Sequence, residues 1–141
     1  MNWVKKHILY IAWAVALAAT LGSLYFSNIL HFAPCVLCWY QRIFMYPLVL
    51  IIGIEILRKD KMIDVYVLPM AMIGFAISVY HNLLVWNIIP ESAAPCTIGV
   101  PCTTKFVDYF GFITIPFLSL ISFLFIIIAM FIYRKAVSKN A

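Results

Sequence analysis

Residues 8–27 of this chain are ILYIAWAVALAATLGSLYFS, a run without a charged side chain. A helix of roughly 20 apolar residues crosses a hydrocarbon core of about 30 Å. Three more charge-poor stretches follow, at about residues 39–57, 62–84 and 106–133. Helices are expected because a lone open strand cannot satisfy its backbone in lipid. The sequence therefore predicts an all-α integral membrane protein, with one domain over residues 1–141 that forms a bundle of four transmembrane helices.

The composition supports a membrane protein and excludes several other classes. Hydrophobic residues make up 66% of the chain and charged residues 11%, whereas a soluble domain has about 45–50% and about 25%. A soluble fold of this size leaves too much surface exposed to hide so many apolar side chains. A soluble globular protein, a disordered tail and a small secreted disulfide-rich protein are therefore excluded.

The distribution of basic residues predicts the orientation in the membrane. The net charge is +5, but no basic stripe is interleaved with aromatic residues, so nucleic-acid binding is not expected. Four spans place both termini on one side, and only Arg42 and Lys105 lie on the other. The positive-inside rule makes both termini cytoplasmic and turns the segments at about 28–38 and 90–105 outward. The other eight basic residues form three clusters: Lys5 and Lys6; Arg58, Lys59 and Lys61; and Arg134, Lys135 and Lys139.

All four cysteines lie in the two outward segments: Cys35 and Cys38 in the first, Cys96 and Cys102 in the second. Disulfides form and persist outside the cytoplasm. The C-x-x-C pair stands at the start of the second span, where unpaired N–H groups stabilise a thiolate. Arg42, four residues after Cys38, lies on the same helix face and adds positive charge. Arginine costs about 2.5–3.5 kcal/mol at the centre of a bilayer, so a thiolate or an oxygen-rich ligand is the expected reason for it.

Other interpretations of these residues remain open. Two structural disulfides could join the loops, although a short C-x-x-C loop is strained and easily exchanged. A four-cysteine zinc site fits less well because Cys96 and Cys102 are further apart than the usual ligand pair; no metal site is predicted. His81, near the outer end of the third span, is a candidate ligand contact because ionisable groups inside membranes are often functional.

Residues 35–42, CVLCWYQR, closely resemble the signature of the bacterial DsbB-type disulfide-formation proteins, called BdbC in some bacteria. The resemblance covers nearly the whole chain. It includes the four spans, the two outward cysteine pairs, Tyr80-His81 in the third span, and Phe110-Gly111 followed by Pro116. The second loop is shorter than in the best-known enterobacterial members.

The resemblance implies a membrane thiol-disulfide oxidoreductase of the bacterial cytoplasmic membrane. Such an enzyme reoxidises an extracytoplasmic thioredoxin-like thiol oxidase of the DsbA or BdbD type and passes the electrons to ubiquinone or menaquinone, supporting disulfide bond formation. Cys96 and Cys102 match the pair that exchanges with the partner. Cys35 and Cys38 match the pair that quinone reoxidises, with the Cys38 thiolate at the quinone ring and Arg42 beside it.

Two alternatives differ from this interpretation. An enzyme similar to vitamin K epoxide reductase does related chemistry on a four-helix core, but its C-x-x-C follows the loop cysteines along the chain, whereas here Cys35 and Cys38 come first. A small tetraspan scaffold with static disulfides is the non-enzyme alternative.

Overall fold

The computed structural model describes residues 2–29, 31, 36–58, 62–88, 90 and 115–139. Within these ranges the secondary structure is helical, and no strand is present. Each helix is long and apolar enough to cross a membrane. The predicted class, an all-α four-helix membrane bundle, is confirmed. The helices are α1 (Asn2–Asn28), α2 (Val36–Arg58), α3 (Ile63–Val85) and α4 (Ile115–Lys139).

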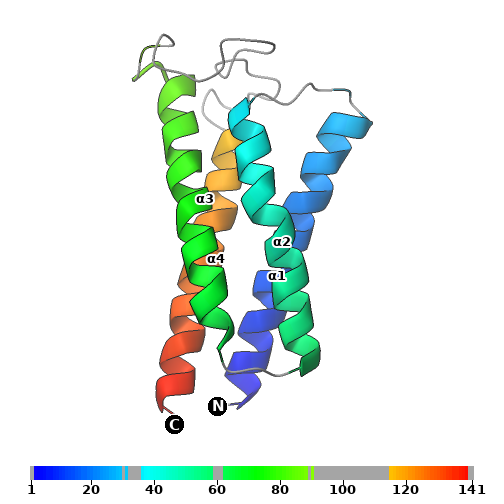
Figure 1. The fold of residues 1–141 in the computed structure, drawn as a ribbon, viewed down its shortest axis with the longest axis vertical. Helices are drawn as coiled ribbons and strands as arrows, with labels where there is room; N and C mark the ends of the chain where they lie inside the picture. The colour runs from blue at the N-terminus through cyan, green and yellow to red at the C-terminus, as the bar shows by residue number, and fades with distance from the viewer. Residues whose placement is uncertain are drawn as a thin grey trace.

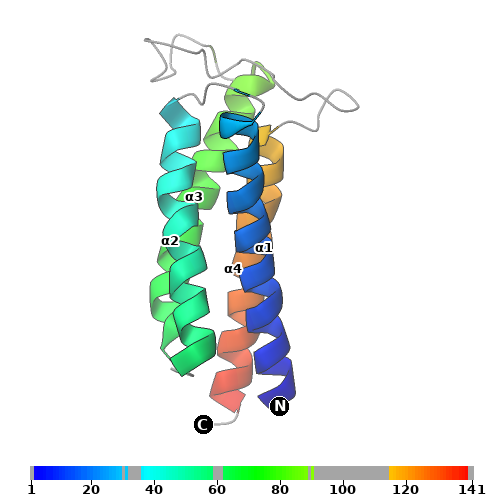
Figure 2. The same ribbon diagram turned by 90° about the vertical axis from the view of Figure 1, so that its right-hand side faces the viewer.

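The four helices form a closed ring in which each packs mainly against two neighbours. Helices that follow one another in the chain are in contact, and α4 returns to pack against α1. The chain runs up and down, so α1 begins and α4 ends at the same end of the bundle (Figures 1 and 2). The half nearer that end is here called the terminal half, and the other is called the cavity half.

The helix bounds differ from the predicted spans at the two ends of the chain. Helix α1 begins at Asn2 instead of about residue 8, and α4 continues to Lys139 instead of ending near residue 133. Hydropathy marks the part of a helix that lipid surrounds, whereas a helix continues through the interface, where long basic side chains reach water. Residues 106–114 of the predicted fourth span lie outside the described residues.

The core of the bundle contains small and large apolar side chains in tight contact. Phe123 of α4 is fully buried, and a Cβ atom built on Gly74 of α3 would collide with its ring. Trp13 of α1 donates its Nε1–H to the carbonyl oxygen of Val49 on α2 at 3.1 Å. Close approach at small residues of this kind is how helices associate in lipid.

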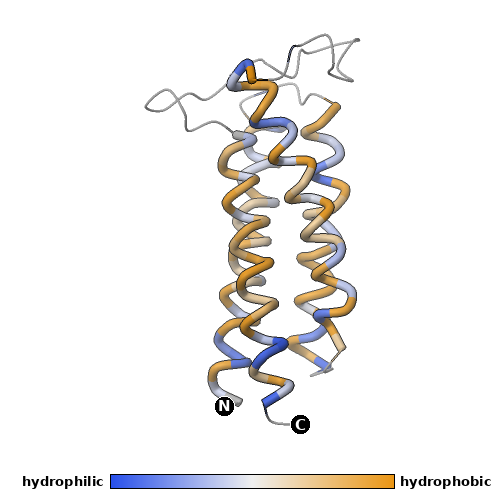
Figure 3. Tube along the Cα trace, turned by 90° about the vertical axis from the view of Figure 1, so that its left-hand side faces the viewer, coloured by the Kyte–Doolittle hydropathy of each residue, from blue (hydrophilic) through white to orange (hydrophobic). Residues whose placement is uncertain are grey.

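The outer surface of the bundle is apolar, as lipid requires. Leu57 is 83% exposed and Leu50 is 68% exposed. Figure 3 shows hydrophobic residues along most of each helix, with hydrophilic residues toward both ends of the bundle, including the end that holds the termini. The described members of the basic clusters lie at that end, whereas Arg42 lies in the cavity half, so the charge asymmetry of the sequence is also an asymmetry of the fold.

Helix α3 ends in the cavity half with a specific backbone motif. Asn87 has a φ of 60°, and the N–H of Ile88 reaches the carbonyl oxygen of Leu83 at 3.0 Å, while that of Asn87 reaches Leu84 at 3.1 Å. These two bonds form a Schellman motif, in which asparagine tolerates the left-handed position better than most residues. The motif therefore ends α3 just beyond the turn that carries His81 and Asn82.

Candidate functional site: a cavity at the start of α2

A cavity of about 280 Å³ lies in the cavity half, between α1, α2 and α4. Helix α1 leans away from α2 toward this end of the bundle (Figure 1). The α1 side of the cavity is formed by small residues, and a Cβ atom built on Gly22 would meet nothing within 4 Å. The lining residues are Ala18, Ala19, Gly22, Ser23, Phe26 and Ser27 of α1; Cys38, Gln41, Arg42, Met45 and Tyr46 of α2; and Leu118, Ser119 and Ser122 of α4.

Cys38 occupies the first turn of α2, as the sequence predicts. The helix begins at Val36, so the backbone N–H groups around Cys38 belong to the turn that has no intrahelical acceptors. Its side chain is half-buried, lines the cavity and packs against the cluster of Leu37 and Leu84. Cys38 therefore joins the helix N-terminus, which favours negative charge, to the cavity.

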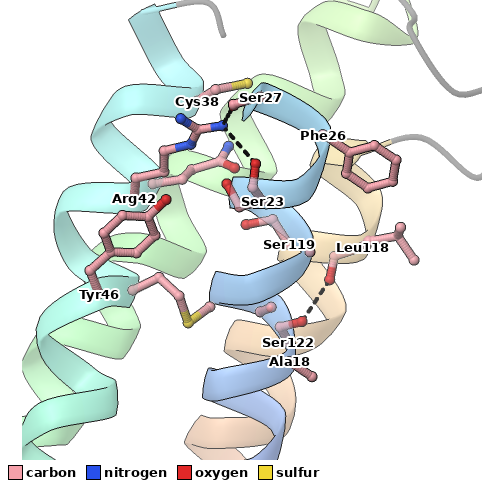
Figure 4. A pocket seen from close by; sticks show the side chains of 14 residues that line it. Ala18, Ser23, Phe26, Ser27, Cys38, Arg42, Tyr46, Leu118, Ser119 and Ser122 are labelled. Carbon is pink, nitrogen blue, oxygen red and sulfur yellow. Dashed lines mark hydrogen bonds between the residues drawn. The ribbon is translucent and has the colours of Figure 1, made fainter. Parts of the chain in front are cut away.

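Arg42 lies one turn further along α2 and also lines the cavity (Figure 4). Its Nη2 donates hydrogen bonds to the carbonyl oxygen of Ser23 at 3.1 Å and to the hydroxyl of Ser27. The guanidinium lies 5.4 Å from the ring centre of Trp39. No carboxylate in the described part of the chain forms an ion pair with Arg42. Neutral groups thus hold the guanidinium of Arg42 in place, and they do not neutralise its positive charge.

Within the described part of the chain, two polar atoms of the cavity lining are buried without a hydrogen-bond partner: Nε of Arg42 and the hydroxyl oxygen of Tyr46. A buried polar group without a partner costs about 1–3 kcal/mol, so such groups are uncommon outside binding and catalytic sites. Both atoms can donate a hydrogen bond. The cavity thus suits a ligand that has acceptor oxygens on an apolar frame.

His81 is placed differently from Cys38 and Arg42. It is 1% exposed and is absent from the cavity lining; its Nδ1 lies 3.1 Å from Nε2 of Gln41, which does line the cavity. Because an amide N–H donates, the His81 Nδ1 acts as the acceptor in this pair. His81 therefore touches the cavity through Gln41, and direct ligand contact by His81 stays a prediction.

A polar network joins α3 to the start of α4 behind the cavity. Nδ2 of Asn82 donates to the carbonyl oxygens of Ser78 at 2.7 Å and of Pro116 at 3.0 Å. The hydroxyls of Ser78 and Ser119 lie 3.3 Å apart. These bonds hold the first turns of α4 in register with α3, and so place Ser119 and Ser122 at the cavity wall.

Three predicted site residues, Cys35, Cys96 and Cys102, lie outside the described residues. The structure brings together Cys38 and Arg42, and it adds residues that the sequence analysis did not select. Tyr46 lies four residues after Arg42, which lies four after Cys38. This spacing places all three on one helix face. The same reasoning that linked Arg42 to Cys38 would therefore have found Tyr46.

A four-helix membrane bundle with a C-x-x-C cysteine at a cavity defines a class of membrane thiol proteins. Comparisons with known proteins point to one family within this class. The family described as "Disulfide bond formation protein DsbB" matches residues 5–133. Disulfide bond formation protein C of Bacillus subtilis (strain 168) is 55% identical over 133 residues, which cover 93% of this chain and 95% of that protein. Probable disulfide formation protein C 1 of Bacillus anthracis is 52% identical over 132 residues, covering 93% and 94%.

The chain belongs to the DsbB family of disulfide bond formation proteins. Probable disulfide formation protein of Oceanobacillus iheyensis (strain DSM 14371 / CIP 107618 / JCM 11309 / KCTC 3954 / HTE831) is also similar, at 39% identity over 137 residues, covering 96% of this chain and 94% of that protein. No solved structure matches the chain. Membership of this family implies a membrane thiol oxidoreductase that forms disulfides, and it favours the DsbB-type prediction over the static scaffold.

Proposed function

We propose that this protein reoxidises an extracytoplasmic thioredoxin-like thiol oxidase and passes the electrons to a membrane quinone. The observation that carries the proposal is the placing of Cys38 and Arg42 on one cavity, with unpartnered donor groups in its lining. The cavity lies in the half of the bundle opposite the described basic clusters. By the positive-inside rule that half faces outward, toward the thiol partner.

The cavity fits a quinone in size and in chemistry. A cavity of about 150 Å³ accommodates benzene, so 280 Å³ is roomy enough for a substituted ring. Small α1 residues, with open space above Gly22, offer a flat wall. Arg42 Nε and the Tyr46 hydroxyl are donors, and quinone oxygens are acceptors. Cys38, Arg42 and their neighbours on the cavity wall would hold the ring, either of ubiquinone or of menaquinone.

The thiol relay follows from ordinary exchange chemistry, in which a thiolate attacks a disulfide sulfur. In the proposed order a partner thiolate attacks the Cys96–Cys102 bond at Cys96, and the freed Cys102 attacks Cys35. The Cys35–Cys38 bond breaks, and Cys38 leaves as a thiolate. The second partner thiol then displaces Cys96, so the partner gains a disulfide. The freed Cys96 thiolate attacks Cys102 of the Cys102–Cys35 bond, which restores the Cys96–Cys102 disulfide and releases Cys35, so that Cys35 and Cys38 are both reduced. Each attack forms one S–S bond and breaks one, so no electrons are lost on the way.

The residues around Cys38 stabilise the leaving thiolate. The unpaired N–H groups of the first turn of α2 and the guanidinium of Arg42 both favour negative charge at this position. A bound quinone would accept two electrons and two protons, so that the Cys35–Cys38 disulfide forms again. The same fixed positive charge also stabilises negative charge that develops on the acceptor.

The test is a thiol-trapping and quinone-reduction assay on the purified protein. The reduced partner oxidase is added with a short-chain ubiquinone or with menadione, quinone reduction is followed by absorbance, and free thiols are alkylated at each stage. Cys38→Ser should abolish quinone reduction. Cys96→Ser should abolish partner oxidation but leave the Cys35/Cys38 pair reactive with quinone. Normal partner oxidation by Cys96→Ser would refute the relay order, and cysteines that never cycle would indicate a static scaffold.

Orientation is tested separately with a membrane-impermeant thiol reagent on intact cells. After mild reduction, Cys96 and Cys102 should be labelled from outside. Labelling only after the cells are opened would place the cysteine loops in the cytoplasm and refute the proposed partner.

A further inference from the structure

Tyr46 is the deepest polar residue of α2 in the cavity lining, one helical turn beyond Arg42. Its hydroxyl is buried and has no hydrogen-bond partner among the residues that the structure describes. In Figure 4 the ring lies below Arg42, and the hydroxyl is directed toward the outer end of the cavity. Tyrosine hydroxyls usually find a partner when buried, so this group requires an explanation.

Among the described residues, no group forms a hydrogen bond with the Tyr46 hydroxyl. Two α1 acceptors beside Arg42, the Ser23 carbonyl and the Ser27 hydroxyl, already accept from Nη2 of Arg42. Arg42 Nε is a donor only and cannot accept. The two unpartnered groups of the lining, one turn apart on the same helix face, therefore form a pair of donors with no acceptor between them.

We propose that Tyr46 is a further quinone-binding residue, whose hydroxyl donates a hydrogen bond to the ring carbonyl oxygen that lies farther from Cys38. This inference rests on the proposed function and extends it. Cys38, Arg42 and Tyr46 follow one another by single turns from the outer end of α2. Arg42 is thus the donor to the nearer carbonyl, and Tyr46 is the donor to the farther one. A site with two donors selects a ring with two carbonyl oxygens, because a ligand lacking one leaves a buried donor unpaired.

The test is Tyr46→Phe, which removes the hydroxyl and keeps the ring. Binding of a short-chain ubiquinone to the oxidised protein, without any thiol donor, is measured by titration calorimetry in detergent. Loss of one neutral hydrogen bond should raise Kd by about 3- to 10-fold. The KM for the same quinone should rise by a similar factor, whereas kcat at saturating quinone should change by less than about twofold.

Tyr40→Phe is the matched control. Tyr40 lies on the same helix, is 45% exposed and is absent from the cavity lining. Its substitution should leave Kd and KM unchanged. The thermal unfolding midpoint of ligand-free Tyr46→Phe should equal or exceed that of the unsubstituted protein, because the variant loses a buried hydroxyl that has no partner in the fold.

An unchanged Kd in Tyr46→Phe, while the unsubstituted protein binds and reduces quinone, would overturn the inference and leave the proposed function standing. A lower midpoint with unchanged Kd would also overturn it, by showing that the hydroxyl acts within the fold. Absence of quinone binding by the unsubstituted protein would overturn the proposed function as well.

Discussion

The two halves of the bundle treat their buried polar groups differently. In the terminal half, polar groups are paired: the Tyr133 hydroxyl donates to Oε1 of Glu55 at 3.4 Å, and Nε of Arg134 lies 3.5 Å from Oδ2 of Asp64. In the cavity half, some buried polar groups are paired, such as Gln41 with His81, but others remain without partners among the described residues. Among the described residues, every buried side-chain polar atom without a partner belongs there: Thr20 Oγ1, Arg42 Nε, Tyr46 Oη and Asn82 Oδ1.

The packing shows the same contrast. Apolar residues of all four helices form one continuous core that runs from the terminal half to the level of the cavity, with Phe123 in close contact with Gly74 near the middle of the bundle. In the cavity half α1 leaves room above Gly22. A protein that only had to hold four helices together would close this space, because each unfilled cavity and unpaired donor costs stability. The proposed function accounts for this difference: the continuous core stabilises the fold, and the space beside α1 is left open for a ligand.

The largest expected effect is on the cavity half. Arg42→Ala should lower kcat/KM for quinone by about 10- to 100-fold, because it removes a charged donor worth about 1.5–3 kcal/mol. Exchange with the reduced partner should fall much less. Separate measurement of quinone reduction and of partner oxidation by single-turnover thiol trapping checks this. Equal quinone kinetics in the variant would contradict a ligand role for Arg42.

The same small substitution should act oppositely in the packed core and at the cavity wall. Gly74→Ala forces a Cβ atom into the Phe123 ring and should lower the unfolding free energy by about 1–3 kcal/mol. Gly22→Ala meets nothing within 4 Å and should leave stability unchanged or slightly higher. Reversible unfolding in detergent measures both. Equal destabilisation by the two changes would contradict the difference in packing between the core at Gly74 and the cavity wall at Gly22.

Filling the cavity should weaken quinone binding and leave the stability of the fold unchanged. Gly22→Leu places a branched side chain in the open space of the lining and should raise the quinone KM by about 10-fold, equivalent to about 1.4 kcal/mol. Gly22→Ala is the graded control and should have a smaller effect. The two variants are compared by quinone titration and by unfolding midpoint. If Gly22→Leu binds quinone normally, the ligand lies elsewhere.

The smallest effect is expected for the ion pair between α3 and α4 in the terminal half. Asp64→Asn breaks the ion pair with Arg134, whose side chain is 66% exposed. An ion pair open to solvent contributes at most about 1 kcal/mol. The unfolding free energy should therefore fall by less than about 1 kcal/mol, with quinone kinetics unchanged. A change in quinone KM would show that the two halves are coupled.

The sequence was sufficient for the class and for the first two site residues. Uninterrupted apolar stretches predict spans because lipid leaves the backbone few alternatives, and the i, i+4 spacing of Cys38 and Arg42 places them on one helix face. Helices α1 and α4 extend beyond the predicted spans because basic residues such as Lys5 and Lys139 remain helical beyond the apolar stretch. Gln41 was missed because its contact with His81 depends on how α3 packs against α2, whereas the position of Tyr46, four residues after Arg42, could have been found from the same spacing.

Four membrane helices, the charge asymmetry and a cysteine at the start of α2 follow from the sequence alone. They depend only on spacing along one helix and on the cost of exposing backbone or charge to lipid. Which polar groups find hydrogen-bond partners depends instead on the tertiary structure. Arg42 Nη2 is satisfied by α1, and Gln41 pairs with His81 of α3, whereas Arg42 Nε and the Tyr46 hydroxyl are left without acceptors. Hydrogen bonds between helices depend on how the helices lean against each other, and no single stretch of sequence contains that information.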